Sequence, residues 1–343
     1  MHTSFKHYIP LFEEKLHAID VQSLAIAPYC KRYLNHLLQN SKYYLHIYAA
    51  VLEKVKKESS TPIIEMHLLD YGAGNGLLGL FAKYCGFEKV IVNDIDESFL
   101  TASTVLAKQM GIDIHHFILG DLDAVKKEEL SEKIDALVAT DLIEHIYDLD
   151  GFVATMSSIN PNIISVFTTG SNPENYFKVR SLMKLQNRDE YFGGKEDDAL
   201  LFGHDAHESY LKIREKIIKD VAPELDENII LKLAKFTRGK NKSDIINDVK
   251  KFQSTKELPL LINHPTNTCH PETGSWTERL VAILTYKSIF RHHQFELQIS
   301  SGFYNQYQPG IKGIALFFLN KIKSIFGLKL DPFIFLTGKK MIS

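Results

Sequence analysis

The stretch LLDYGAGNGLLGL, from Leu68 to Leu80, decides the fold of this chain. An apolar run ends at Asp70, and Gly72, Gly74 and Gly76 then lead into a segment with helical periodicity. Glycine has no Cβ, so it permits positive φ and lets a ligand approach the backbone, while the following helix offers unpaired N–H groups. The stretch therefore predicts a strand, a ligand-binding turn and a helix.

Short apolar runs alternate with amphipathic, helix-length segments on the C-terminal side of this stretch. This rhythm is typical of repeated βαβ units and a parallel sheet. A further helix and two strands are expected near the C-terminus. The predicted strands are 65–71, 89–94, 113–119, 136–140, 163–168, 295–302 and 333–339, and the predicted helices are 77–85, 97–110, 126–133, 149–158 and 277–292.

Acidic side chains follow the next three predicted strands. VIVNDID contains Asp94, ILGDLD contains Asp121, and ALVATDLIEHI contains Asp141, Glu144 and His145. Ligands of open parallel sheets bind beyond the carboxyl ends of the strands. Together with the glycine turn, these residues predict one ligand site along that edge of the sheet.

This set of motifs resembles the class I S-adenosylmethionine-dependent methyltransferase superfamily, whose glycine motif has the GxGxG form seen here as GAGNG. The resemblance is specific over 66–170 and looser over 277–340. It implies an α/β fold with a doubly wound, mostly parallel seven-stranded sheet. The C-terminal strand would be antiparallel, and an N-terminal helical cap and a helical insertion would be added.

The resemblance also assigns roles in binding the methyl donor S-adenosylmethionine. The glycine loop would lie against its methionine and ribose portions, Asp94 would hold the ribose hydroxyls, and Ile95 would pack on adenine. Asp70 would position the amino-acid end through the loop, and Asp121 would accept from the adenine amino group. Alternatively, Asp94 is a helix cap and Asp121 a turn residue. The full donor set is Asp70, Gly72, Ala73, Gly74, Gly76, Asp94, Ile95, Asp121, Leu122 and Asp141.

The segment TDLIEHI, residues 140–146, resembles the branch that contains the ubiquinone-biosynthesis O-methyltransferases. Imidazole has an unperturbed pKa of about 6.5, so His145 could remove a proton from the acceptor as the methyl group arrives. The alternative is a structural hydrogen bond to a backbone carbonyl. Asp141, Glu144 and His145 could also hold a divalent ion, but we assign no metal.

Composition changes divide the chain into a helical cap (1–60), the donor-binding core (61–171), a polar, helix-prone insertion (172–276) and a C-terminal part that completes the core (277–343). The insertion is expected to bind the acceptor, because loops on a rigid scaffold commonly build such pockets. For two of its histidines, His204 and His207, a solvated helix face is the alternative. The candidate acceptor contacts are His204, His207, His264, His270 and Trp276.

The 343 residues carry a formal net charge of −2, which favours no nucleic-acid partner. Three scattered cysteines and the absence of an apolar leader or an 18-residue apolar run indicate a reduced, cytoplasmic protein without a transmembrane span. The segment 310–330 mixes bulky apolar residues with four lysines. It predicts a helix packed on the sheet or, alternatively, a helix that contacts a membrane surface.

The expected activity is methyl transfer to oxygen or nitrogen of a small-molecule acceptor. A nicotinamide-dependent oxidoreductase is the alternative enzyme, disfavoured because GxGxxG would be typical and Leu77 stands at the third glycine position. A catalytically inactive methyltransferase fold that serves as a binding protein is the alternative outside enzymes. Intact acidic strand ends argue against it.

Overall fold

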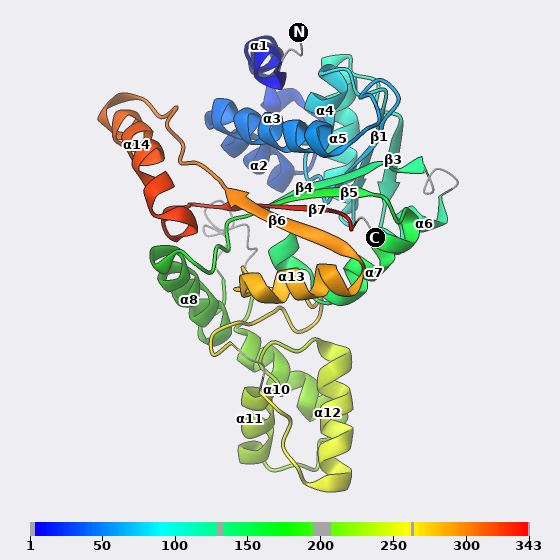
Figure 1. Cartoon of the computed structure of the whole chain (residues 1–343). Coiled ribbons are helices and arrows are strands. Elements are labelled where there is room, and N and C mark those ends of the chain that lie inside the picture. The colour runs from blue at the N-terminus through cyan, green and yellow to red at the C-terminus, as the bar shows by residue number, and fades with distance from the viewer. Residues whose placement is uncertain (1–3, 129–132, 195–206, 262–263, 342–343) are drawn as a thin grey trace. The chain divides into compact units, whose positions relative to one another are not determined.

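A seven-stranded sheet, in the order β3-β2-β1-β4-β5-β7-β6, is the centre of the fold (Figure 1). The computed structural model describes residues 4–128, 133–194, 207–261 and 264–341. Contacts divide the chain into two compact units, and the sheet belongs to the first, which comprises 1–143, 149–169 and 283–343. The strands are β1 (His67–Tyr71), β2 (Lys89–Asp94), β3 (His116–Leu119), β4 (Ala136–Thr140), β5 (Ile164–Thr169), β6 (Phe295–Ser301) and β7 (Ile334–Lys340).

The strand directions confirm the predicted fold class. β1 pairs with β2 and β4 in parallel, as do β2 with β3 and β4 with β5. The last strand, β7, lies between β5 and β6 and is antiparallel to both. The carboxyl ends of β1, β2, β3 and β4 therefore meet at one edge of the sheet, as the sequence predicted.

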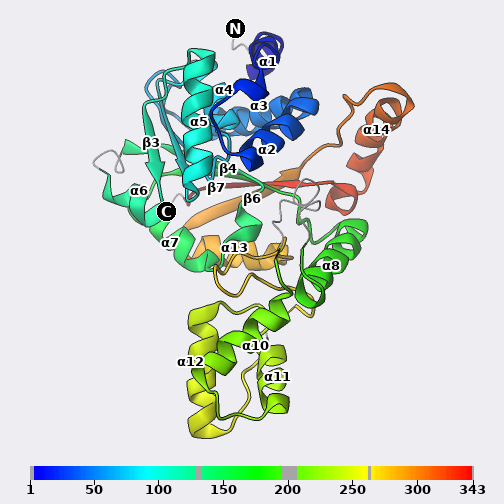
Figure 2. The ribbon, with the colours of Figure 1, turned by 180° about the vertical axis from the view of Figure 1, so that it is seen from behind.

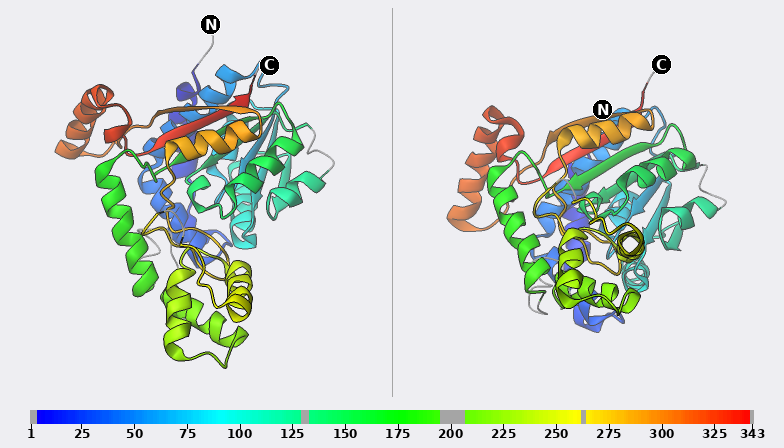
Figure 3. Two further views of the ribbon diagram at one scale, coloured as in Figure 1. Left: turned by 60° about the horizontal axis from the view of Figure 1, so that its bottom comes forward. Right: turned by 90° about the horizontal axis from the view of Figure 1, so that it is seen from below.

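Helices of the first unit cover both faces of this sheet, as in a doubly wound fold (Figures 1 and 2). The helices α3, α4 and α5 lie on one face, and α6, α7 and α13 lie on the other, where α13 contacts β6 and α7 (Figure 3). Their bounds are α3 (Ser41–Glu58), α4 (Leu77–Tyr84), α5 (Glu97–Met110), α6 (Leu122–Lys127), α7 (Leu149–Ile159) and α13 (Ile283–His292).

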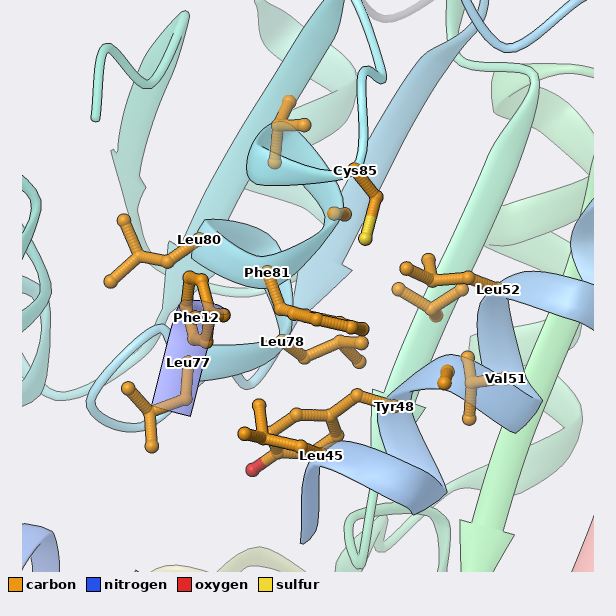
Figure 4. Packing of buried hydrophobic residues seen from close by; sticks show 14 of the residues in the cluster. Phe12, Leu45, Tyr48, Val51, Leu52, Leu77, Leu78, Leu80, Phe81 and Cys85 are labelled. Atoms are coloured by element: carbon orange, nitrogen blue, oxygen red, sulfur yellow. The ribbon is translucent and has the colours of Figure 1, made fainter. Parts of the chain in front are cut away.

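The N-terminal cap consists of α1 (Ile9–His17), α2 (Pro28–Gln39) and α3. Its apolar side chains pack against α4 (Figure 4). Phe12 of α1 packs edge-on against Phe81 of α4, with ring centroids 5.2 Å apart. Leu45 and Tyr48 of α3 join the same buried cluster. Because α4 follows the glycine loop directly, this packing also fixes the position of the loop.

The second unit comprises 144–148 and 170–282 and is helical. It contains α8 (Tyr176–Tyr191), α10 (Tyr210–Val221), α11 (Glu227–Phe236) and α12 (Lys242–Thr255). The last three helices share a small apolar core. A fully buried ion pair between Arg214 and Glu190 connects α10 to α8, and the Nε of Arg214 donates to the carbonyl of Ala234 (2.8 Å).

Two predicted helices have different bounds in the structure. The helix expected at 126–133 begins earlier, at Leu122, because the Asp121 carboxylate accepts from the N–H of Ala124 and caps it there; 129–132 lie outside the described residues. The helix expected at 277–292 begins only at Ile283. Before it, the N–H groups of Thr277 and Leu280 are held by the carbonyl of Thr268 (2.9 Å) and by Asn267 Oδ1 (3.0 Å).

The helix expected within 310–330 is present as α14 (Gly310–Ile322), followed by two short 3₁₀ turns (Lys323–Ile325 and Gly327–Leu330). The expectation that it packs on the sheet is wrong: Gly313 is its one buried residue. Among the described residues, no helix has the length and apolar character that crossing a membrane requires.

Candidate functional site

The glycine loop between β1 and α4 requires glycine at each of its three positions. Gly72, Gly74 and Gly76 all have positive φ, at 64°, 56° and 74°. A Cβ on Gly72 would lie 2.7 Å from the side chain of Leu142, and one on Gly76 would lie 2.9 Å from Ser103. The loop is therefore closely packed, and larger residues would displace it.

Asp70, at the end of β1, holds the far side of this loop. Its Oδ2 accepts from the N–H of Gly79 (2.7 Å), in the first turn of α4. The carboxyl is almost fully buried, and this burial raises its pKa to about 7, although the Gly79 hydrogen bond favours the charged form. Asp70 thus positions the loop from beneath, through the start of α4.

We expect Asp70→Asn to change how stability depends on pH. The pKa of Asp70 is raised in the folded state, so the wild type loses stability as pH rises from 3.8, the ordinary pKa of aspartate, through about 7. Asparagine still accepts from Gly79 but cannot ionise. The free energy of unfolding of the variant, relative to that of the wild type, should therefore be up to about 4 kcal/mol higher at pH 8 than at pH 4.

Urea unfolding followed by far-ultraviolet circular dichroism, at several pH values, measures this difference. Asp121→Asn is a matched control, because that carboxylate also accepts a backbone N–H but is exposed. A constant difference between Asp70→Asn and wild type from pH 4 to pH 8 would mean that the buried carboxyl does not carry this linkage.

Asp94, at the end of β2, contacts the glycine loop directly. Its Oδ2 accepts from the N–H of Gly74 (2.8 Å) and its Oδ1 from the N–H of Asp96 (2.9 Å). A carboxylate oxygen can accept two hydrogen bonds, so acceptor capacity remains on Asp94. The helix cap of α5 is Asp96, not Asp94. The adjacent Ile95 is 75% exposed.

Asn93 of β2 holds the residues at the end of β3 through hydrogen bonds. Sequence analysis did not single out this residue. Its Nδ2 donates to the carbonyls of Ile118 and Gly120, both at 2.9 Å. Asp121 follows as the cap of α6, so its carboxylate has a structural partner. Leu122 is buried.

Asp141, at the end of β4, has a strained backbone with φ of 50°. Its N–H donates to the carbonyl of Thr168 (3.1 Å). Non-glycine residues with positive φ are costly and concentrate at functional sites. This conformation is a second reason, besides its position, to include Asp141 in the site.

Tyrosines of the N-terminal cap face the same edge, and sequence analysis did not identify them. A Cβ on Gly74 would lie 3.3 Å from the ring of Tyr33. Burial raises the pKa values of Tyr33, Tyr43 and Tyr44, the last to about 12, and the negative charge of Asp141 raises each further. The cap therefore places the ring of Tyr33 beside the glycine loop. The helical spacing of these tyrosines was visible in the sequence, but it indicated only apolar packing.

His145 belongs to the second unit, where both ring nitrogens have neighbours. Nδ1 lies 2.7 Å from the carbonyl of Trp276, and Nε2 lies 3.8 Å from the Glu278 carboxylate. The Nδ1 contact requires a proton on that nitrogen, which leaves the lone pair of neutral histidine on Nε2. Glu278 also accepts from the hydroxyl of Ser171 (2.8 Å) and has φ of 46°. Glu278 had no motif and was missed.

The candidate acceptor residues have separate environments within the second unit. His207 stacks on Tyr210 (4.6 Å) and lies edge-on to His270 (6.1 Å), whose pKa is lowered by burial. His264 contacts Thr266 instead. Trp276 is buried and stacks on Tyr147 at 5.8 Å, so it supports the His145 segment. His204 lies outside the described residues.

The described residues contain one group of three metal-ligand side chains within 4.8 Å: Asp150, His292 and His293. Glu144 and His145 are not in it. Asp150 lies in the first turn of α7 and the histidines at the end of α13, where the helix dipoles favour these charges. The two histidines lower the pKa of Asp150 by hydrogen bonding to its carboxylate. The group is an ion-pair arrangement at the surface.

The strand order and the glycine loop define the class of protein: an α/β fold of the Rossmann-like methyltransferase type. Part of the chain is similar to named methyltransferases. Ubiquinone biosynthesis O-methyltransferase of Rickettsia akari is 25% identical over 121 residues, which are 35% of this chain and 46% of that protein. The mitochondrial ubiquinone biosynthesis O-methyltransferase of Homo sapiens is 29% identical over 117 residues, 32% of this chain and 30% of that protein.

These similarities confirm the resemblance to class I S-adenosylmethionine-dependent methyltransferases. The chain matches less than half the length of these two relatives. No protein-family model matches the chain.

Solved structures of similar type cover more of the chain at lower identity. The YcgJ protein from Bacillus subtilis covers 87% of this chain and all of its own, with 11% identity and a TM-score of 0.44. A putative S-adenosylmethionine-dependent methyltransferase from Listeria monocytogenes covers 86% of this chain and 99% of its own, with 11% identity and a TM-score of 0.42. Both TM-scores are low, so the fold assignment rests on the strand order.

Proposed function

We propose that the protein transfers a methyl group from S-adenosylmethionine to an oxygen or nitrogen of a small-molecule acceptor. The observation that carries this proposal is the hydrogen bond that the N–H of Gly74, in the glycine loop, donates to the Asp94 carboxylate. It brings an acidic strand end and a closely packed, glycine-rich loop to one edge of the sheet. A donor with a ribose diol and an adenine ring has a matching partner for each part.

The residues of this edge fit that donor. Gly72, Gly74 and Gly76 allow the positive-φ backbone of the loop, and the Asp94 carboxylate has acceptor capacity for ribose hydroxyls. Exposed Ile95 offers an apolar surface to adenine. The Asp121 carboxylate would accept from the adenine amino group in addition to capping α6, with Leu122 behind it.

Methyl transfer from a sulfonium is an in-line displacement in which the acceptor lone pair attacks the methyl carbon. The protein therefore acts mainly by holding donor and acceptor in line. An acceptor hydroxyl or amine also loses a proton. We assign that proton to Nε2 of His145, because its Nδ1 proton is committed to the Trp276 carbonyl. Glu278, 3.8 Å away, would stabilise the imidazolium that forms.

We expect His145→Ala to lower kcat by about 100-fold or more, the usual contribution of a general base. The wild-type rate should fall in acid solution, and the variant should lose that pH dependence. His145→Gln is the matched variant, because its side chain can donate to the Trp276 carbonyl without acting as a base. Transfer of labelled methyl to a panel of phenols, catechols and amines, at several pH values, measures both effects.

Full activity of His145→Ala at every pH would exclude the base assignment while leaving donor binding intact. Activity retained by His145→Gln but lost in His145→Ala would make His145 a positioning residue.

We also propose that the second unit, with His204, His207, His264 and His270, selects the acceptor. The relatives are named for ubiquinone biosynthesis, which favours a phenolic acceptor for the first screen. The alternatives remain distinct in outcome: a nicotinamide oxidoreductase would bind NADH, and an inactive binding protein would turn over no acceptor.

A further inference from the structure

The helix α14 exposes its apolar side instead of burying it. Ile311, Ile314, Phe318 and Ile322 recur at three- and four-residue spacing and form one stripe along the helix. All four are exposed, Ile311 to 86%. A helix that packs against a protein core shows the opposite arrangement, with this stripe inward.

Polar contacts fix the other side of α14 to the first unit. Asn320 accepts from the N–H of Tyr304 (2.7 Å) and donates to the Tyr304 carbonyl (3.0 Å). Lys323, just after the helix, forms a buried ion pair with Asp331 (2.6 Å). A Cβ on Gly313 would lie 2.0 Å from the carbonyl oxygen of Gln308. The orientation of the stripe is therefore set by specific contacts.

The apolar surface continues into the turn that follows. Ile325 and Phe326 are 79% and 52% exposed, and Phe317 is exposed beside the stripe. Surface hydrophobic residues are normally scattered, and a contiguous patch marks a binding surface. We call this surface the α14 patch; it consists of Ile311, Ile314, Phe317, Phe318, Ile322, Ile325 and Phe326.

Cationic side chains accompany the α14 patch. The segment 310–330 contains four lysines and no acidic residue, although the whole chain has a formal net charge of −2. Lys323 is neutralised by Asp331, while Lys312, Lys321 and Lys329 are exposed. Lys321 also lies over the ring of Phe317, 4.6 Å from its centroid.

We propose that the α14 patch docks the protein on an anionic phospholipid surface. Apolar side chains enter the boundary of the acyl region, and flanking lysines are attracted to the negative headgroups. At 13 residues α14 is too short to span a bilayer, so it would lie in the surface. A second copy of the chain fits less well, because a symmetric contact through this patch would bring like-charged lysines together.

Co-sedimentation of the full chain with lipid vesicles tests this proposal. We expect binding to vesicles of phosphatidylcholine with phosphatidylglycerol, weaker binding to phosphatidylcholine alone, and a decrease as salt is added. The double variant Ile314→Glu, Phe318→Glu should bind the anionic vesicles about 10-fold less or worse. Lys312→Glu, Lys329→Glu should lose the preference for anionic vesicles, and it keeps the apolar stripe.

Leu284→Glu is the matched control, because Leu284 is exposed on α13 in the same unit and should leave vesicle binding unchanged. Circular dichroism checks that each variant folds. Absence of binding by the wild type, or equal binding by the Ile314→Glu, Phe318→Glu variant, would overturn the proposal. So would a wild-type dimer that this variant converts to a monomer in sedimentation. The proposal does not depend on methyl transfer.

Discussion

Asp94→Ala should weaken binding of S-adenosylhomocysteine by about 100-fold or more, since hydrogen bonds to a charged group contribute roughly 1.5–3 kcal/mol each. The substitution would remove the acceptor that we propose for the ribose hydroxyls. It also releases the Gly74 N–H, so the glycine loop loses its hydrogen bond to the Asp94 carboxylate. Calorimetric titration of both proteins measures the change.

Asp96→Ala is the matched control for this prediction. Asp96 is an acidic residue two positions away, but its side chain caps α5 at the surface. Its loss should cost about 1 kcal/mol of stability and leave donor affinity unchanged. Equal affinity of Asp94→Ala and wild type would remove Asp94 from the donor site.

Arg214→Met should destabilise the second unit by about 3–5 kcal/mol, because it removes the closer of the two cations that face the buried carboxylate of Glu190. Both side chains are almost completely inaccessible to solvent. Glu190 then keeps the hydroxyl of Thr268 (2.7 Å) and the more distant Arg238, whose Nε lies 4.0 Å from its Oε2. The single tryptophan, Trp276, lies in the same unit. Its fluorescence during urea unfolding therefore reports this unit.

The double variant Arg214→Met, Glu190→Gln separates the ion pair from general packing. Removing both charges should recover much of the lost stability, since no buried carboxylate is left without Arg214, and Arg238 keeps its hydrogen bonds to the carbonyls of Thr266 and Asn267. A double variant as unstable as Arg214→Met would mean that Arg214 acts through its packing and its bond to the Ala234 carbonyl.

The edge of the sheet at the carboxyl ends of β1 to β4 was predictable, because buried parallel strands leave a strong pattern in the local sequence. The bounds of β2 and β4 match the predicted ranges, and Asp94 and Asp141 stand at their ends. Apolar runs bounded by glycine and aspartate carry this information within a few residues. The GAGNG loop then indicated at which end of the strands the candidate site lies.

Contacts distant in sequence were not predictable in the same way. Tyr33 lies beside Gly74 only because the N-terminal cap folds onto α4, and Glu278 reaches His145 across more than a hundred residues of chain. The outward face of α14 depends on Asn320 and Lys323 finding polar partners, which periodicity alone does not show. For α14, these tertiary contacts decided between the two orientations that the local sequence allowed.

Calorimetric titration of the wild-type protein with S-adenosylhomocysteine, with NADH as the comparison ligand, tests the central claim most directly. The account predicts micromolar binding of S-adenosylhomocysteine and none of NADH. Binding of NADH alone would establish the oxidoreductase alternative, and binding of neither would contradict the assignment of this glycine loop and Asp94 to a methyl donor.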